Sequence, residues 1–131
     1  MRVASFALTV LDYDEAIAFY VGKLGFTLEE DTDLGGGKRW VRVRASASTA
    51  GASILLARAV GDAQRASVGR QTGGRVFFFL ETDDFARDFG RFVDRGVKVA
   101  RAPRDEPYGK VAVLEDPYGN LFDLIEPKKT S

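Results

Sequence analysis

The chain has 131 residues, of which 45% are hydrophobic, so a single domain with an apolar core is expected. Its 19 Lys and Arg residues balance 19 Asp and Glu residues, and zero net charge argues against a nucleic-acid or anionic-membrane partner. It contains no cysteine and no histidine, which excludes disulfides, Cys- or His-ligated metal sites and imidazole-dependent catalysis. The short apolar run at the N-terminus fits neither a signal peptide nor a membrane span, so we expect a cytoplasmic protein.

The first half of the chain predicts a strand, a helix and three further strands. Residues 3–10 are apolar and β-tending, and helical spacing follows between Asp12 and Gly25. Asp12 precedes Glu15 by three residues, as in a capping box, and Gly25 is a typical helix stop. The next three strands are predicted at FTLEED, KRWVRVR and ASILLARA. Residues 1–60 therefore form a first βαβββ module.

The second half repeats this order. Residues 61–73 are polar and rich in glycine, which indicates a linker. RVFFFLE then predicts a strand, a helix is bracketed by Asp84 and Gly96, and three more strands end with NLFDLIEP. Residues 74–131 are thus a second βαβββ module. The predicted fold class is α+β, with two tandem modules forming a curved mixed sheet whose uncovered face is an open cleft.

Three stretches of the sequence resemble the vicinal oxygen chelate superfamily: FALTVLDYDEAIAFYVGKLGF, FLETDDFARDFGRFVDRGV and EDPYGNLFDL. This superfamily includes glyoxalase I, extradiol dioxygenases, fosfomycin-resistance thiol transferases and bleomycin-resistance proteins, and the resemblance covers essentially the whole chain. It implies the paired βαβββ fold and, for relatives of this length, a homodimer whose clefts are completed by the partner subunit. It does not determine the activity, because one fold supports many functions.

The resemblance also implies where a divalent metal is held in relatives that use one. The corresponding positions are Ser5, Leu55, Phe77 and Asp123, of which only Asp123 carries a strong ligand. A hard cation needs several oxygen or nitrogen ligands, so we expect no metal and no other cofactor. The nearest functional relatives are then the metal-free members that sequester drugs. The expected partner is a small aromatic, drug-like molecule.

The alternation of side chains along strands predicts which residues line the cleft. In KRWVRVR, Val41 and Val43 suit the helix-covered face. Trp40, Arg42 and Arg44 then point to the open face. By the same alternation, Phe77 and Phe79 of RVFFFLE share the open face. Asp123 of the last strand, which lies between two apolar residues, also points to it. The predicted ligand-binding residues are Ser5, Trp40, Arg42, Phe77, Phe79, Tyr108 and Asp123.

Each of these aromatic residues has an alternative interpretation. Trp40, Phe77 and Phe79 either offer a stacking surface to a planar ligand or belong to the core. Tyr108 lies in the turn-rich segment APRDEPYGK, which is either a lid over the cleft or a simple connection.

The charged residues also leave alternatives open. Asp123 and Glu81 are the candidate catalytic residues, because a carboxyl group on an apolar strand can have a raised pKa and act as a general acid or base. Glu81 alternatively stabilises the N-terminus of the second helix, and Arg42 alternatively forms an ion pair with Asp123. The leading function is a metal-free binding protein. The alternatives are a superfamily enzyme of lyase, dioxygenase or thiol transferase type, with an altered acid-base or weak-metal site, and a scaffold without a ligand.

Overall fold

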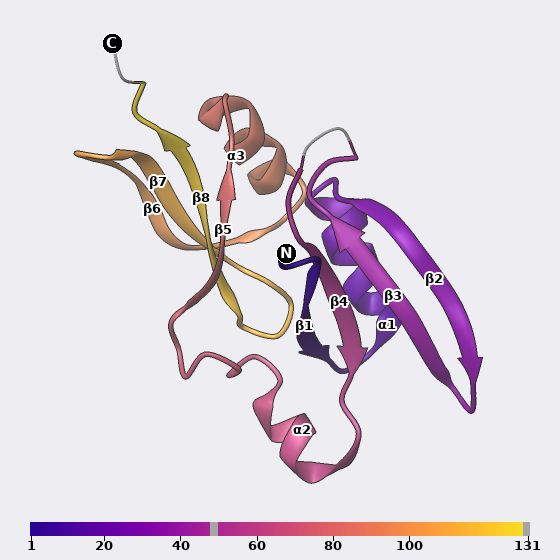
Figure 1. Ribbon diagram of the computed structural model, residues 1–131. Helices are drawn as coiled ribbons and strands as arrows, with labels where there is room; N and C mark the ends of the chain where they lie inside the picture. The colour runs from indigo at the N-terminus through magenta and orange to yellow at the C-terminus, as the bar shows by residue number, and fades with distance from the viewer. Residues whose placement is uncertain (48–49, 130–131) are drawn as a thin grey trace. The chain divides into compact units, whose positions relative to one another are not determined.

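A computed structural model of the chain describes residues 1–47 and 50–129. The chain divides into two compact units, Met1–Gln71 and Thr72–Ser131, and each unit has its own four-stranded mixed sheet (Figure 1). Both units place a helix after their first strand and three strands after that helix. The α+β class and the tandem βαβββ order are therefore confirmed.

Unit 1 contains a sheet in the order β1-β4-β3-β2, with β1 parallel to β4 and the other neighbours antiparallel. A helix that begins as α1 and widens into a π-helical segment, η1, supplies buried aromatic side chains such as Tyr20 to the core. The core also contains Val41 and Val43, as predicted. The elements are β1 (Ser5–Val10), α1 (Tyr13–Ile17), η1 (Ala18–Lys23), β2 (Thr27–Gly35), β3 (Lys38–Arg44) and β4 (Ser53–Arg58).

Unit 2 repeats this arrangement, with the sheet order β5-β8-β7-β6 and β5 parallel to β8. Phe85 and Phe92 of its helix are buried, and Phe78 stacks on Phe122 with ring centroids 5.0 Å apart. These aromatic contacts form the core between helix and sheet. The elements are β5 (Val76–Glu81), α3 (Phe85–Asp94), β6 (Lys98–Glu106), β7 (Gly109–Glu115) and β8 (Leu121–Pro127).

The module helices have the predicted caps. The Asp12 carboxylate accepts a hydrogen bond from the Glu15 backbone N–H at 2.8 Å, and Asp84 accepts one from the Arg87 N–H at 3.1 Å. Each cap satisfies a backbone donor that the first helical turn leaves free. Among the helices of residues 1–47 and 50–129, none has the length and apolar character needed to cross a membrane.

The turn DPYGN sets the register of β8. Asp116 Oδ1 accepts hydrogen bonds from the backbone N–H groups of Tyr118 and Asn120, both at 2.9 Å, and its Oδ2 accepts one from Asn120 Nδ2 at 2.8 Å. With the turn held in this way, Phe122 and Leu124 are fully buried on the helix side. Asp123 therefore points to the opposite face, as the sequence predicts.

The segment predicted as a linker is more ordered than expected. It contains a short exposed helix, α2 (Gly61–Ser67), and unit 1 extends to Gln71. The Gln71 side chain donates to the Ala7 carbonyl at 2.8 Å and accepts from the Thr9 N–H at 3.0 Å. This side-chain amide therefore satisfies backbone groups on β1.

Candidate functional site

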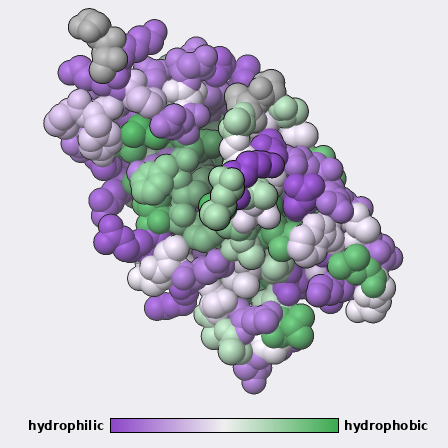
Figure 2. Space-filling model, viewed as in Figure 1, coloured by the Kyte–Doolittle hydropathy of each residue, from purple (hydrophilic) through white to green (hydrophobic). Residues whose placement is uncertain are grey.

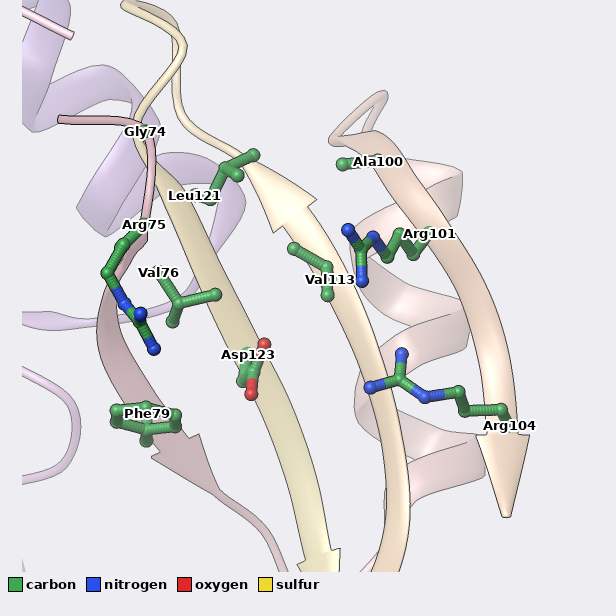
Figure 3. A pocket seen from close by; sticks show the side chains of 10 residues that line it. All are labelled: Gly74, Arg75, Val76, Phe79, Ala100, Arg101, Arg104, Val113, Leu121 and Asp123. Carbon is green, nitrogen blue, oxygen red and sulfur yellow. The ribbon is translucent and has the colours of Figure 1, made fainter. Parts of the chain in front are cut away.

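A pocket of about 370 Å³ lies on the face of the unit 2 sheet that does not carry α3 (Figure 3). All four strands of this sheet contribute to it, together with the residues that lead into β5. The whole pocket therefore belongs to unit 2. Its lining residues are Gly74, Arg75, Val76, Phe79, Ala100, Arg101, Arg104, Val113, Leu121 and Asp123.

One row of paired residues crosses the pocket. Phe79 pairs with Asp123, Asp123 with Val113, and Val113 with Arg101. Partners in adjacent strands share one face of a sheet, so a ring, a carboxyl group and a guanidinium group lie in one line. Phe79 is 68% exposed, which is unusual for a phenylalanine in a strand. Apolar surface gathers over β5 and β8 in Figure 2.

Asp123 is an incompletely satisfied carboxyl group. Its Oδ1 is buried and accepts no hydrogen bond from the described part of the chain. Burial raises the pKa of Asp123, because a charged carboxylate loses solvation there, while the positive charges of Arg104 and Arg101 partly oppose the rise. Asp123 thus lines the pocket with a carboxyl group whose hydrogen-bonding capacity the described part of the chain does not fill.

Three guanidinium groups surround this carboxyl group in Figure 3. Arg104 donates a hydrogen bond to Glu106 at 2.7 Å. For the guanidinium groups of Arg75 and Arg101, residues 1–47 and 50–129 supply neither a hydrogen-bond partner nor an ion-pair partner within 4 Å. Most of the positive charge in the pocket is therefore not neutralised by direct contacts.

Strand irregularities decide which residues reach the pocket. A register shift between Val76 and Phe78 interrupts the alternation of β5, so Val76 and Phe79 line the pocket. Phe77 lies at this bulge, is half-buried and contacts Phe78 edge to face. The prediction that Phe77 shares a face with Phe79 depends on unbroken alternation, and the bulge overturns it.

The arginines of the pocket were not predicted from the sequence. Two register shifts in β6, one on each side of Arg101, bring Arg101 and Arg104 to the same pocket although they are three residues apart. Strict alternation would have put them on opposite faces. Pro103 between them was the available sign of irregular pairing, since proline cannot donate to a sheet ladder.

The open face of unit 1 carries Trp40 and Arg42, as predicted, with Trp40 39% exposed. Arg42 donates to Glu29 at 3.0 Å and to Glu30 at 3.1 Å. Arg44 also binds Glu29, and this hydrogen bond is the main cause that lowers the pKa of Glu29. Arg42 thus has carboxylate partners within its own unit.

Tyr108 occupies a tight turn and not a long loop. Residues up to Glu106 belong to β6, and Glu106 pairs with Gly109 at the start of β7. The Tyr108 carbonyl accepts from the Lys128 N–H at 2.8 Å, which holds the turn against the end of the chain. A two-residue turn closed by strand pairing is too short for the suggested lid, and Tyr108 does not line the pocket.

Glu81 ends β5, is exposed and pairs with Ile125, outside the pocket lining. The role at the helix N-terminus that was suggested for it belongs to Glu126, whose carboxylate accepts the Phe85 N–H at 2.8 Å. Ser5 is exposed at the start of β1, and Leu55 is half-buried in β4. Ser5 remains a prediction as a ligand contact, and Glu81 remains one as a candidate catalytic residue.

The fold and pocket can now be compared with known proteins. The sequence profile described as Glyoxalase/Bleomycin resistance protein/Dioxygenase superfamily matches residues 2–124. The chain belongs to this superfamily. It is 53% identical over 125 residues to an uncharacterized protein of Shewanella frigidimarina (strain NCIMB 400), covering 95% of this chain and 92% of that protein.

Two solved structures are similar to this chain over nearly its whole length. UcmS2 is 26% identical, with a TM-score of 0.83 and coverage of 96% of this chain and 98% of that one. TnmS3, an antibiotic binding protein from Streptomyces sp. CB03234, is 31% identical, with a TM-score of 0.77 and coverage of 98% and 97%.

Some superfamily members hold a divalent cation, so the residues at the corresponding positions decide whether this chain could bind one. The chain offers the Ser5 hydroxyl and the Asp123 carboxylate, while Leu55 and Phe77 provide no ligand atom. Asp123 is close enough to Arg101 and Arg104 to feel their charge, which disfavours a cation. Within the described ranges, no three His, Cys, Asp or Glu side chains gather as a metal site would require. The residues present do not fit the metal.

Proposed function

We propose that the protein binds a planar aromatic small molecule, of the kind found among antibiotics, in the pocket of unit 2 and without a metal. The observation that carries the proposal is the adjacent placement on the pocket face of Phe79, 68% exposed, and Asp123, whose carboxyl group is not fully hydrogen-bonded by residues 1–47 and 50–129. An exposed ring provides stacking area at a small entropic cost, and the carboxyl group orients a polar substituent.

The relatives support this proposal. TnmS3, which is 31% identical over nearly the whole length of both chains, is described as an antibiotic binding protein. Sequestration requires a shaped aromatic surface with a few polar groups and needs no catalytic group. The pocket meets that requirement with Phe79, Val113 and Leu121 around the central carboxyl group.

A thermal-shift screen followed by calorimetry tests the proposal, with naphthalene- and anthraquinone-based compounds as probes. A compound that binds the native state raises the melting temperature by mass action. We expect at least one probe to do so, and Phe79→Ala to weaken its binding about tenfold. Val93→Ala, which alters an exposed apolar residue on α3, is the matched control and leaves binding unchanged. No shift by any probe at millimolar concentration contradicts the proposal.

A second candidate function is acid-base catalysis, favoured by the raised pKa of Asp123. In this case a bound substrate turns over, and Asp123→Asn abolishes turnover while retaining binding. Mass spectrometry of probes incubated with the protein distinguishes the two functions. Unchanged probes recovered in full support binding alone.

We also propose that the protein is a homodimer, as expected for superfamily members of this length. Sedimentation equilibrium at micromolar concentration checks the mass. A monomer under these conditions contradicts the proposal.

A further inference from the structure

The charge of the pocket indicates more than a preference for aromatic rings. Arg75, Arg101 and Arg104 all line it, and Asp123 is the one carboxyl group in the lining. Arg104 has Glu106 as a partner, but Arg75 and Arg101 have no carboxylate partner among residues 1–47 and 50–129. Two guanidinium groups are thus available to a ligand.

The open face of unit 1 provides an internal comparison. Arg42 and Arg44 also lie on a sheet face without a helix, but Glu29 and Glu30 bind them at close range. Arginines on that face are therefore neutralised by their own unit. Arg75 and Arg101 of the pocket have no carboxylate within 4 Å among residues 1–47 and 50–129, so the two sheet faces differ in how far their arginines are neutralised.

The chemistry of the arginine side chain indicates which substituent of a ligand would bind it best. A guanidinium group is planar and presents several donors that match a carboxylate or another delocalised oxyanion. It also stays charged throughout the physiological pH range. An amine in the same position faces electrostatic repulsion from Arg75 and Arg101, and a neutral amide gains a weaker hydrogen bond.

The position of Phe79 defines the rest of the ligand. Phe79 and Arg101 belong to the same row across the sheet, separated by Asp123 and Val113. A molecule that stacks on the ring and extends across the row brings its substituent toward the guanidinium group. The Asp123 carboxyl group lies between them in the row, and in its protonated form it can donate a hydrogen bond to an oxygen of the ligand.

We infer that the pocket selects planar aromatic acids, whose ring packs on Phe79 while the oxyanion binds Arg101 at the other end of the row, and Arg75, on the Phe79 side of Asp123 in Figure 3, adds to the positive charge. This inference rests on the proposed binding function and specifies its ligand class. It also predicts that binding weakens with salt, because the contact is between charges at a partly exposed site.

Three naphthalene derivatives with the same ring test the inference: 2-naphthoate, 2-naphthamide and 2-naphthylmethylammonium. Calorimetry at low ionic strength is expected to give at least tenfold tighter binding of the acid than of the amide, with the ammonium compound weakest. Arg101→Gln and Arg75→Gln each reduce the affinity for 2-naphthoate severalfold, and their combination removes its advantage over 2-naphthamide. The affinity for 2-naphthamide changes less than twofold in these variants.

Arg91→Gln is the matched control, because Arg91 is an exposed arginine on α3, outside the pocket. It leaves all three affinities unchanged. Melting curves of the free variants confirm that each is folded.

The results distinguish a failure of this inference from a failure of the proposed binding function. If the amide or the ammonium compound binds as tightly as the acid, the inference is overturned and the binding function stands. If the acid binds best but Arg75→Gln and Arg101→Gln have no effect, the assignment of the oxyanion site is wrong. If none of the three compounds and none of the wider probes binds, the proposed function fails together with the inference.

Discussion

Phe79 and Asp123 are direct partners across the parallel β5–β8 ladder, so a largely exposed ring and a partly buried carboxyl group occupy adjacent positions on one face. On the opposite face of the same strands, Phe78 stacks on Phe122 in the core. One face of this strand pair therefore contributes to the core, and the other lines the pocket. We therefore expect changes at Phe79 or Asp123 to alter the proposed ligand binding with little loss of core packing.

The first prediction concerns the pH dependence of stability at Asp123. Its pKa is raised in the folded state, so its ionisation destabilises the fold. This destabilisation is absent below the pKa of the unfolded chain and becomes complete as the pH rises through the folded pKa. Asp123→Asn therefore gains stability relative to the wild type between acid and neutral pH. The gain is about 1 kcal/mol or less, because solvent screens a partly exposed group.

Denaturant titrations of both proteins across this pH range measure the difference. Arg101, Arg104 and Arg75 are the charged residues that line the pocket with Asp123, and all remain protonated over this range. Asp62→Asn, on the exposed helix α2, is the control and shows no such trend. A wild-type protein that gains stability relative to Asp123→Asn as the pH rises contradicts the prediction.

The second prediction concerns metal content. A divalent cation would have Asp123 as its single carboxylate ligand, with Arg101 and Arg104 nearby. We therefore expect elemental analysis of the purified protein to find no stoichiometric divalent metal. Treatment with a chelator should leave both the melting temperature and the affinity for the aromatic probes unchanged. One tightly bound metal ion per chain, or loss of binding after chelation, is the contrary result.

The third prediction concerns the charged cluster on unit 1. The pKa of Glu29 is lowered, mainly by its hydrogen bond from Arg44, so its ionised form stabilises the fold. This contribution is present above the pKa of the unfolded chain and is lost as the pH falls through the folded pKa. Glu29→Gln therefore lowers the melting temperature at pH 7, and the difference from the wild type shrinks in acid.

Scanning calorimetry at neutral and acid pH checks this trend. Glu15→Gln is a suitable control, since Glu15 is exposed and its backbone N–H, not its side chain, takes part in the helix cap. High salt should also reduce the effect of Glu29→Gln, because ions screen charge pairs that are only partly buried. An equal difference at all pH values would mean that the charge of Glu29 is not the cause.

The sequence predicted the elements better than it predicted the pocket. Helix caps at Asp12 and Asp84 and the turn at Asp116 are local features, and their hydrogen bonds form within a few residues. Burial of Val41 and Val43 follows from regular alternation in β3. These parts could be predicted because each depends on short stretches of sequence.

The pocket residues depend on non-local pairing. The bulge in β5 places Val76 in the pocket instead of Phe77, and two shifts in β6 bring Arg101 and Arg104 together. A bulge is set by the partner strand as much as by the bulged one, so alternation within one strand does not locate it. Asp123 was placed correctly because β8 pairs without a shift with β7.

The fourth prediction compares two glycines of unit 2. Gly109 has a φ of +150° at the start of β7, and an added Cβ atom would overlap the Glu126 carbonyl oxygen. Gly90 lies inside α3, where an added Cβ atom meets nothing within 4 Å. Gly109→Ala should therefore lower the free energy of unfolding by about 2–4 kcal/mol, because backbone atoms must move. Gly90→Ala should raise it by about 0.5–1 kcal/mol, since alanine restricts the unfolded chain.

The two variants add the same methyl group, so their opposite signs isolate the local backbone environment as the cause. Urea titrations followed by circular dichroism measure both changes on the same scale. Binding of the aromatic probes by Gly90→Ala should equal that of the wild type, because α3 lies on the other side of the sheet from the pocket. A neutral effect of Gly109→Ala would show that the β6–β7 turn adapts to a side chain and that the contact with Glu126 is not rigid.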